Sequence, residues 1–149
     1  MPMNKEQIAP ALGSLPSGLY VLACGEDFAV VSWVQQAGFE PPMITLALRH
    51  GRGAAEGVLA RKPFTLSVLP EDGIRLAKPF FAGDRAGVAS MLDEQGALKG
   101  AHAWLRCEYE RHISSGDHHV VLANVSEGSP PLRQGSRPLV HLRKDGFRY

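Results

Sequence analysis

The sequence predicts a mainly β fold with short helices, arranged as one closed antiparallel barrel. About seven segments alternate apolar and polar residues as strands do, and most are separated only by brief turns. So many strands with short connections would expose unpaired edges unless the sheet closed on itself. The chain has 149 residues, 44% of them hydrophobic, and no stretch of linker composition divides it. We therefore expect residues 1–149 to form a single domain.

The first half of the chain predicts one helix followed by three strands. Asn4 and Gln7 have the spacing of a capping pair, and apolar residues recur after them at helical intervals, so we expect a helix over 5–12. The expected strands are 19–24, 28–33 and 44–48, with a tight turn at 25–27.

The second half predicts two helices and four strands. A run of helix formers indicates a helix over 54–61, and Asp72 is placed to cap another that runs through Lys78. Residues 82–100 contain four glycines and mixed charge, which we interpret as an exposed excursion over the surface. The expected strands are 64–69, 101–113, 118–125 and 139–142, with turns at 114–117 and 144–146 and a loop at 126–137.

A polar stretch at the end of the second strand is the first candidate for function. Ser32, Trp33 and Gln35 place a hydroxyl, an indole and a carboxamide where a core would be apolar. A flat heteroaromatic ligand needs such groups at its rim and an aromatic wall against its face. Pro41 and Pro42 then turn the chain toward the next strand. The alternative is a surface loop with an exposed Trp and solvated glutamines.

A basic stretch with glycines follows the strand at 44–48. Arg49 and Arg52 lie within it, directly before the helix expected over 54–61. Amides at the start of a helix and neighbouring guanidinium groups both bind anions, so the stretch is a candidate phosphate site. The alternative is a basic turn.

Composition argues against several other classes of protein. The chain has 16 Lys+Arg against 15 Asp+Glu, and a net charge of +1 is too small for a protein that coats nucleic acid. No stretch resembles a signal peptide or approaches the roughly 20 apolar residues of a membrane span, so we expect a cytoplasmic protein with no membrane partner. In a reducing compartment, Cys24 and Cys107 are expected to be buried thiols rather than a disulfide.

The histidines do not predict a metal site. His118 and His119 are adjacent on one expected strand and so point to opposite faces, and no Cys or carboxylate lies at ligand spacing. The glycine patterns of serine hydrolases, of Walker loops and of Rossmann folds are also missing from the sequence. We therefore expect no metal.

Five segments, taken in order, carry a resemblance to a known family. They are Ser32-Trp33-Val34 with Gln36-Ala37 and Phe39 to Pro42; Phe64 to Leu69; Leu105-Arg106-Cys107; Gly116-Asp117-His118; and Pro138-Leu139 with His141, Arg143-Lys144, Gly146 and Tyr149. With these segments the chain resembles the flavin reductase-like, FMN-binding split-barrel proteins. It is especially similar to the flavin reductase domain at the C-terminus of flavodiiron proteins from oxygenic phototrophs.

The resemblance implies a split barrel that forms a homodimer with FMN between the subunits. FAD is an alternative, because it shares the ring and the first phosphate. The residues carried over are Ser32, Trp33, Val34, Gln35 and Gln36 for the ring, and Arg49, His50 and Arg52 for the phosphate. Phe80 matches an aromatic residue of the family, and Lys78 is expected close to the flavin as well.

The resemblance also implies a catalytic candidate. It places His118 beside the flavin face where a nicotinamide docks, so that this residue would orient a hydride donor; the alternative is a solvated hairpin residue. The chain departs from the family at two points: Val30 stands where many members have Thr or Ser, and His50 where the closest relatives have Lys. The second change makes the local charge depend on pH near neutrality.

The function implied is that of an FMN-binding oxidoreductase. NADH or NADPH would pass a hydride to flavin N5, and the reduced flavin would hand electrons to an acceptor that the sequence does not identify. The flavin supplies the chemistry, while the protein supplies orientation and contacts at the rim. The alternatives are a flavin-binding module that relays electrons without turnover and a bare barrel used for protein interaction.

Overall fold

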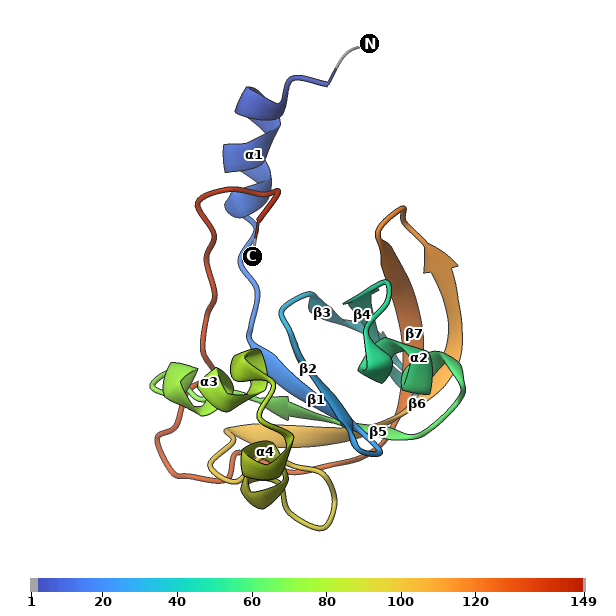
Figure 1. Cartoon of the computed structure of the whole chain (residues 1–149), viewed down its shortest axis with the longest axis vertical. Helices are drawn as coiled ribbons and strands as arrows, with labels where there is room; N and C mark the ends of the chain where they lie inside the picture. The colour runs from blue at the N-terminus through green and yellow to red at the C-terminus, as the bar shows by residue number, and fades with distance from the viewer. Residues whose placement is uncertain (1–2, 149) are drawn as a thin grey trace.

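A single curved antiparallel sheet forms the body of the protein (Figure 1). The computed structural model describes residues 3–148; Tyr149, part of the last family-like segment, lies outside this range. The strands are β1 (Tyr20–Cys24), β2 (Asp27–Val31), β3 (Val34–Phe39), β4 (Pro42–Arg49), β5 (Phe64–Val68), β6 (Ala103–Ser114) and β7 (His118–Gly128). The helices are α1 (Lys5–Gly13), α2 (Gly53–Leu59), α3 (Ile74–Ala82) and α4 (Arg85–Met91). The strand order is β2-β1-β5-β6-β7-β4-β3.

The path of the chain forces this sheet to curl. β2 and β3 form its two edges, yet only Ser32 and Trp33 separate them in sequence. Since consecutive Cα atoms are about 3.8 Å apart, those of Val31 and Val34 are at most about 11 Å apart. Within the described residues no ladder joins the two edges, so the predicted closed barrel is not confirmed and the sheet is open. The Val34 N–H instead donates locally, to the Ser32 carbonyl (3.2 Å).

Two differences from the predicted strands have physical causes. The prediction missed β3, whose side chains at 35–37 are exposed, because an edge strand in contact with water needs no apolar alternation. The predicted strand at 139–142 is wrong: this region forms only isolated bridges, between Ser17 and His141 and, one residue before the predicted strand, between Pro70 and Pro138. Proline has no N–H to donate, so this bridge cannot extend into a ladder.

α1 projects from the body, and the C-terminal segment returns beside it (Figure 1). The predicted capping pair is confirmed, because the Gln7 N–H donates to Asn4 Oδ1 (3.3 Å). The Gly146 N–H donates to the Ala9 carbonyl (2.7 Å), which holds the C-terminal segment against the helix. Within residues 3–148, no helix has the length and apolar character that a membrane span requires.

α3 differs from its predicted bounds. Gly73 rather than Asp72 occupies its N-cap, and the helix continues past Lys78 to Ala82. Phe80 is buried on its inner face, so burial favours the longer helix despite the internal proline.

Most of residues 82–100 are exposed, as predicted, but the segment also contains a helix and buried residues that the prediction missed. They include α4, whose start is capped by a bond from the Gly87 N–H to Asp84 Oδ1 (3.0 Å). Val88 and Leu98 are buried, and the Leu98 N–H donates to Ser67 Oγ of β5 (2.9 Å). The segment therefore covers one face of the sheet.

Two apolar cores lie on the two faces of the sheet. The first includes Leu22 of β1 and Val58 of α2. The second lies under α3 and α4 and includes Phe80. Cys24 and Cys107 are free thiols within the first core, and burial raises the pKa of Cys107 to about 12.

Candidate functional site

A cavity of about 460 Å³ opens where β2 ends. Its walls come from β2, the Ser32-Trp33 junction, the end of β4, the start of α2, and α3. This size lies within the range of about 300–1,000 Å³ typical of small-molecule sites. Five of the predicted site residues meet around it: Ser32, Trp33, Arg49, Arg52 and Phe80.

Ser32 is the most informative residue in this cavity. The residue is 6% exposed, and its Oγ atom makes no hydrogen bond within the described residues. An unsatisfied buried hydroxyl costs about 1–3 kcal/mol, so natural proteins seldom retain one without a use. A ligand with a polar rim would supply the missing partner.

The opposite part of the cavity is basic. Arg49 ends β4 and Arg52 precedes α2, and both side chains are exposed. Within residues 3–148 neither guanidinium lies within 4.0 Å of a carboxylate. Two unpaired guanidinium groups beside a cavity suit a phosphate.

Aromatic and aliphatic side chains form the remaining wall. Phe28 and Phe80 pack edge to face with ring centroids 5.3 Å apart. Ile74 and Phe81, from the same helix as Phe80, remain 47% and 66% exposed at the cavity. Such exposed apolar side chains are typical of a site that a ligand or partner covers.

The other predicted cofactor residues lie outside this cavity. Val34 and Gln35 line a neighbouring groove that shares only Trp33 and Ala47 with the cavity. Gln36 is exposed and donates to the Gly38 carbonyl (3.3 Å). Lys78 is exposed on α3 and His50 points toward His119; neither lines the cavity.

His118 packs against the ring of Trp33. Its side chain is buried, its ring centroid is 4.8 Å from that of Trp33, and its Nδ1 is 2.7 Å from Asp117 Oδ1. The hydrogen bond from His118 lowers the pKa of Asp117, which is therefore a carboxylate that can only accept. His118 Nδ1 is therefore the donor in this hydrogen bond. Arg143 lies over the Trp33 ring (5.1 Å) and helps to fix it.

Sequence reasoning missed several lining residues, among them Ile74, Phe81 and His141. Ile74 and Phe81 are seven residues apart and so share a face of α3, a spacing that could have indicated them. His141 reaches the cavity because its backbone pairs with Ser17, a long-range contact with no local signal.

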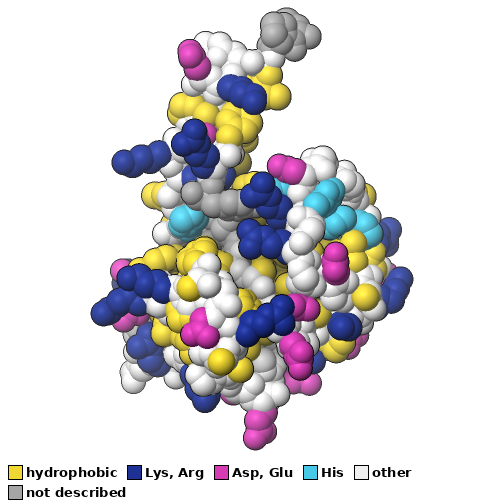
Figure 2. Space-filling model, viewed as in Figure 1, with side chains coloured by type: hydrophobic (Ala, Val, Ile, Leu, Met, Phe, Trp, Pro, Cys, Tyr) yellow, Lys and Arg dark blue, Asp and Glu magenta, His cyan; other side chains and the backbone are white. Residues whose placement is uncertain are grey.

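Histidine side chains also gather at the surface, away from the cavity (Figure 2). The ring of His119 is 4.0 Å from that of His50 and 5.2 Å from that of His112. Burial and these two neighbours lower the pKa of His119. Within the described residues, no group of three or more His, Cys, Asp or Glu side chains is arranged to hold a metal ion.

Comparison with known families decides what kind of protein this is. The family described as Flavin reductase like domain matches residues 12–148, nearly the whole chain. The chain belongs to this family. The predicted resemblance to flavin reductase-like proteins is confirmed.

Relatives of the flavin reductase-like chain occur as parts of longer proteins and as proteins of similar length. A diflavin flavoprotein of a Nostoc species is 37% identical over 98% of this chain but 27% of its own length. The reductase component of 4-hydroxyphenylacetate 3-monooxygenase from Thermus thermophilus is 30% identical over 97% of this chain and 95% of its own. The chain thus spans about a quarter of the diflavin relative.

Solved structures support the flavin reductase-like fold. The flavin reductase of styrene monooxygenase from Pseudomonas putida has a TM-score of 0.74 and 26% identity, covering 89% of this chain and 90% of its own. An NADH:FAD oxidoreductase of Streptomyces globisporus has a TM-score of 0.80 at 21% identity, covering 95% and 90%.

Proposed function

We propose that the chain is an NAD(P)H-dependent flavin reductase that holds FMN, or alternatively FAD, in the cavity beside Ser32. The observation that carries the proposal is the buried Ser32 hydroxyl, which lacks a partner within the described residues and lines a cavity flanked by two arginines. A flavin has what these groups need: a polar rim, an apolar face and a phosphate.

Each cavity residue has a distinct role in this proposal. A flavin bound in this cavity would supply the redox chemistry, with its N5 atom as the hydride acceptor. Ser32 binds the rim of the ring, and Trp33 forms a wall that excludes water. Arg49 and Arg52 hold the phosphate, and their positive charge favours a phosphorylated flavin over one without a phosphate.

His118 enters the proposal as a positioning residue. Its ring contacts Trp33, and its bond to Asp117 fixes the orientation of the imidazole. We infer that His118 orients the nicotinamide donor by holding Trp33 in place. Loss of His118 should therefore lower the rate of flavin reduction more than it lowers the affinity for flavin.

A homodimer completes the proposal. A groove of about 370 Å³ lies between the β3–β4 hairpin and residues 12–17, and it is lined by Val34 and Gln35. Leu15 and Phe147, on or beside the projecting α1 region, are 61% and 47% exposed. A second copy seated in this groove would cover these apolar groups. Light scattering in solution tests this, and a monomer at micromolar concentration would contradict it.

The alternative function is electron relay without turnover. The relay role is favoured by the match to the diflavin relative, because this chain covers only 27% of that protein's length and other regions accompany the matching segment there. A relay would bind flavin in the same cavity but would react slowly with free NADH or NADPH.

Visible absorption of the purified protein separates these functions. A yellow protein that is bleached rapidly by anaerobic NADH or NADPH supports the reductase, and the faster nucleotide identifies the donor. A yellow protein that is not bleached supports the relay. A colourless protein that takes up neither FMN nor FAD excludes both.

A further inference from the structure

The side chain of His141 lines the cavity at the end of β2, and the proposed function gives it no role. Its backbone is fixed by two hydrogen bonds: the His141 N–H donates to the Ser17 carbonyl (2.6 Å), and the Ser17 N–H donates to the His141 carbonyl (3.1 Å). Leu139 packs against the second apolar core, while Val140 and Leu142 are 67% and 66% exposed. Because alternate residues of an extended segment share a face, His141 points inward as Leu139 does.

The imidazole of His141 has no hydrogen-bond partner in the part of the chain that the structure describes. The imidazoles of His102, His112 and His118, in contrast, each bond to a neighbouring side chain at between 2.6 and 2.8 Å. His141 is partly buried, and Ser32 in the same cavity also lacks a partner within the described residues. Two polar side chains thus face one cavity, and both can bond to a ligand there.

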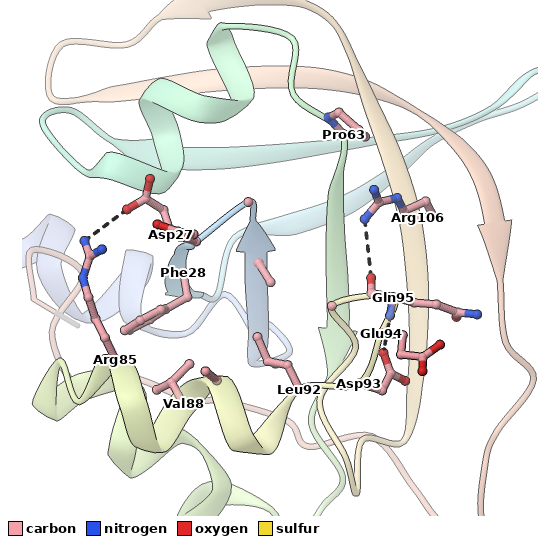
Figure 3. A pocket seen from close by; sticks show the side chains of 15 residues that line it. Asp27, Phe28, Pro63, Arg85, Val88, Leu92, Asp93, Glu94, Gln95 and Arg106 are labelled. Carbon is pink, nitrogen blue, oxygen red and sulfur yellow. Dashed lines mark hydrogen bonds and ion pairs between the residues drawn. The ribbon is translucent and has the colours of Figure 1, made fainter.

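Among the described residues, no carboxylate lines this cavity, and its charged side chains are the two arginines. Glu26 and Asp27 instead line a separate cavity of about 550 Å³, which shares only Phe28 with this one (Figure 3). There Asp27 already pairs with Arg85 (3.3 Å). His141 is therefore the only described lining side chain that can gain or lose a proton near neutral pH.

Cations dominate the charged and titratable groups on the elements around His141. They are Arg49 and Arg52 before α2, Arg75 and Lys78 on α3 and Arg143 on the segment of His141 itself, against Asp27 on β2 and Glu56 on α2, with the phenol of Tyr20 on β1. Burial raises the pKa of Tyr20, which stays neutral. The surplus of positive charge opposes protonation of His141, and negative charge gained by a ligand in the cavity favours it. The charge of the imidazole is therefore coupled to the charge of the ligand.

We propose that His141 contacts the flavin and that its imidazolium form offsets the charge that the ring gains on reduction. This role depends on the proposed function, because it requires flavin in this cavity. Transfer of a hydride breaks the C4–H bond of the nicotinamide, forms the N5–H bond of the flavin and leaves one negative charge on the ring. A cation in the cavity stabilises that charge, so protonated His141 raises the reduction potential of the bound flavin.

The reduction potential of flavin-loaded protein, measured against a reference dye at two pH values, tests this role. His141→Gln keeps a hydrogen-bonding group but removes the charge. At about pH 5.5, where imidazole is protonated, we expect the variant to bind reduced flavin about tenfold more weakly relative to oxidised flavin than the unaltered protein does. For a two-electron couple this is a potential about 30 mV lower. At about pH 9, where imidazole is neutral, the two potentials should agree.

A matched control and a rescue variant accompany this measurement. His102→Gln is the control, because His102 is also partly buried but bonds to Ser136 (2.8 Å) and does not line the cavity. Its potentials should equal those of the unaltered protein at both pH values. His141→Lys is the rescue, because an ammonium group keeps its charge at about pH 9. Its potential there should lie above that of the unaltered protein.

Four results would overturn the role of His141. If His141→Gln matches the unaltered protein at acidic pH, the role is refuted while the proposed function stands. An equal shift at both pH values also refutes it, because altered packing rather than charge would then be the cause. If the potentials stay unchanged and only the KM for NADH or NADPH rises, His141 contacts the donor instead of the flavin. If the unaltered protein takes up neither FMN nor FAD, the proposed function itself fails.

Discussion

Substitution of Ser32 by alanine should move protein stability and flavin affinity in opposite directions. In flavin-free protein the Ser32 hydroxyl is buried without a partner in the described part of the chain, a state that costs about 1–3 kcal/mol. Ser32→Ala removes that cost, so the free energy of unfolding should rise by up to about that amount. With flavin bound, the same change deletes one hydrogen bond, worth about 0.5–1.5 kcal/mol, or a two- to tenfold weaker Kd.

Urea denaturation of flavin-free protein and titration with FMN measure the two effects. Ser67→Ala is the matched control, because Ser67 is equally buried but accepts a hydrogen bond from the Leu98 N–H (2.9 Å). The control should lower the free energy of unfolding by about 1–3 kcal/mol, since it leaves a buried N–H unpaired. If Ser32→Ala destabilises the protein as Ser67→Ala does, or leaves FMN affinity unchanged, the reasoning about the cavity is wrong.

Three further predictions concern the charged groups. Arg49→Gln and Arg52→Gln should each weaken FMN about tenfold without affecting riboflavin, which lacks the phosphate; equal losses for both ligands in titrations would contradict the phosphate role. His118→Ala should slow reduction by NADH or NADPH in stopped-flow measurements while FMN affinity changes little, and an unchanged rate would remove its role. The pKa of His119 lies below 6.5 in the folded protein, so its protonation favours the unfolded chain. The free energy of unfolding should therefore fall as pH drops below about 6.5, and less so in His119→Asn; identical pH profiles in urea titrations would refute this.

Much of the fold could be predicted because the signals are local. The capping pair at Asn4 needs only neighbours within one turn of helix, and the hairpin of β6 and β7 needs only alternation around the turn at 114–117. The bounds of α3 and the packing of α4 could not be predicted this way. Burial of Phe80 and Val88 against the sheet, far away in sequence, decides both.

The sequence by itself determined which chemical groups are available: a hydroxyl and an indole after β2, guanidinium groups after β4, and the family to which the chain belongs. Only the tertiary structure decided which of them meet. Arg49 and His50 are neighbours in the chain, yet the first lines the cavity and the second packs against His119. The reason is geometric, because the curl that brings β2 and β3 together is set by long-range strand pairing, which no local pattern encodes.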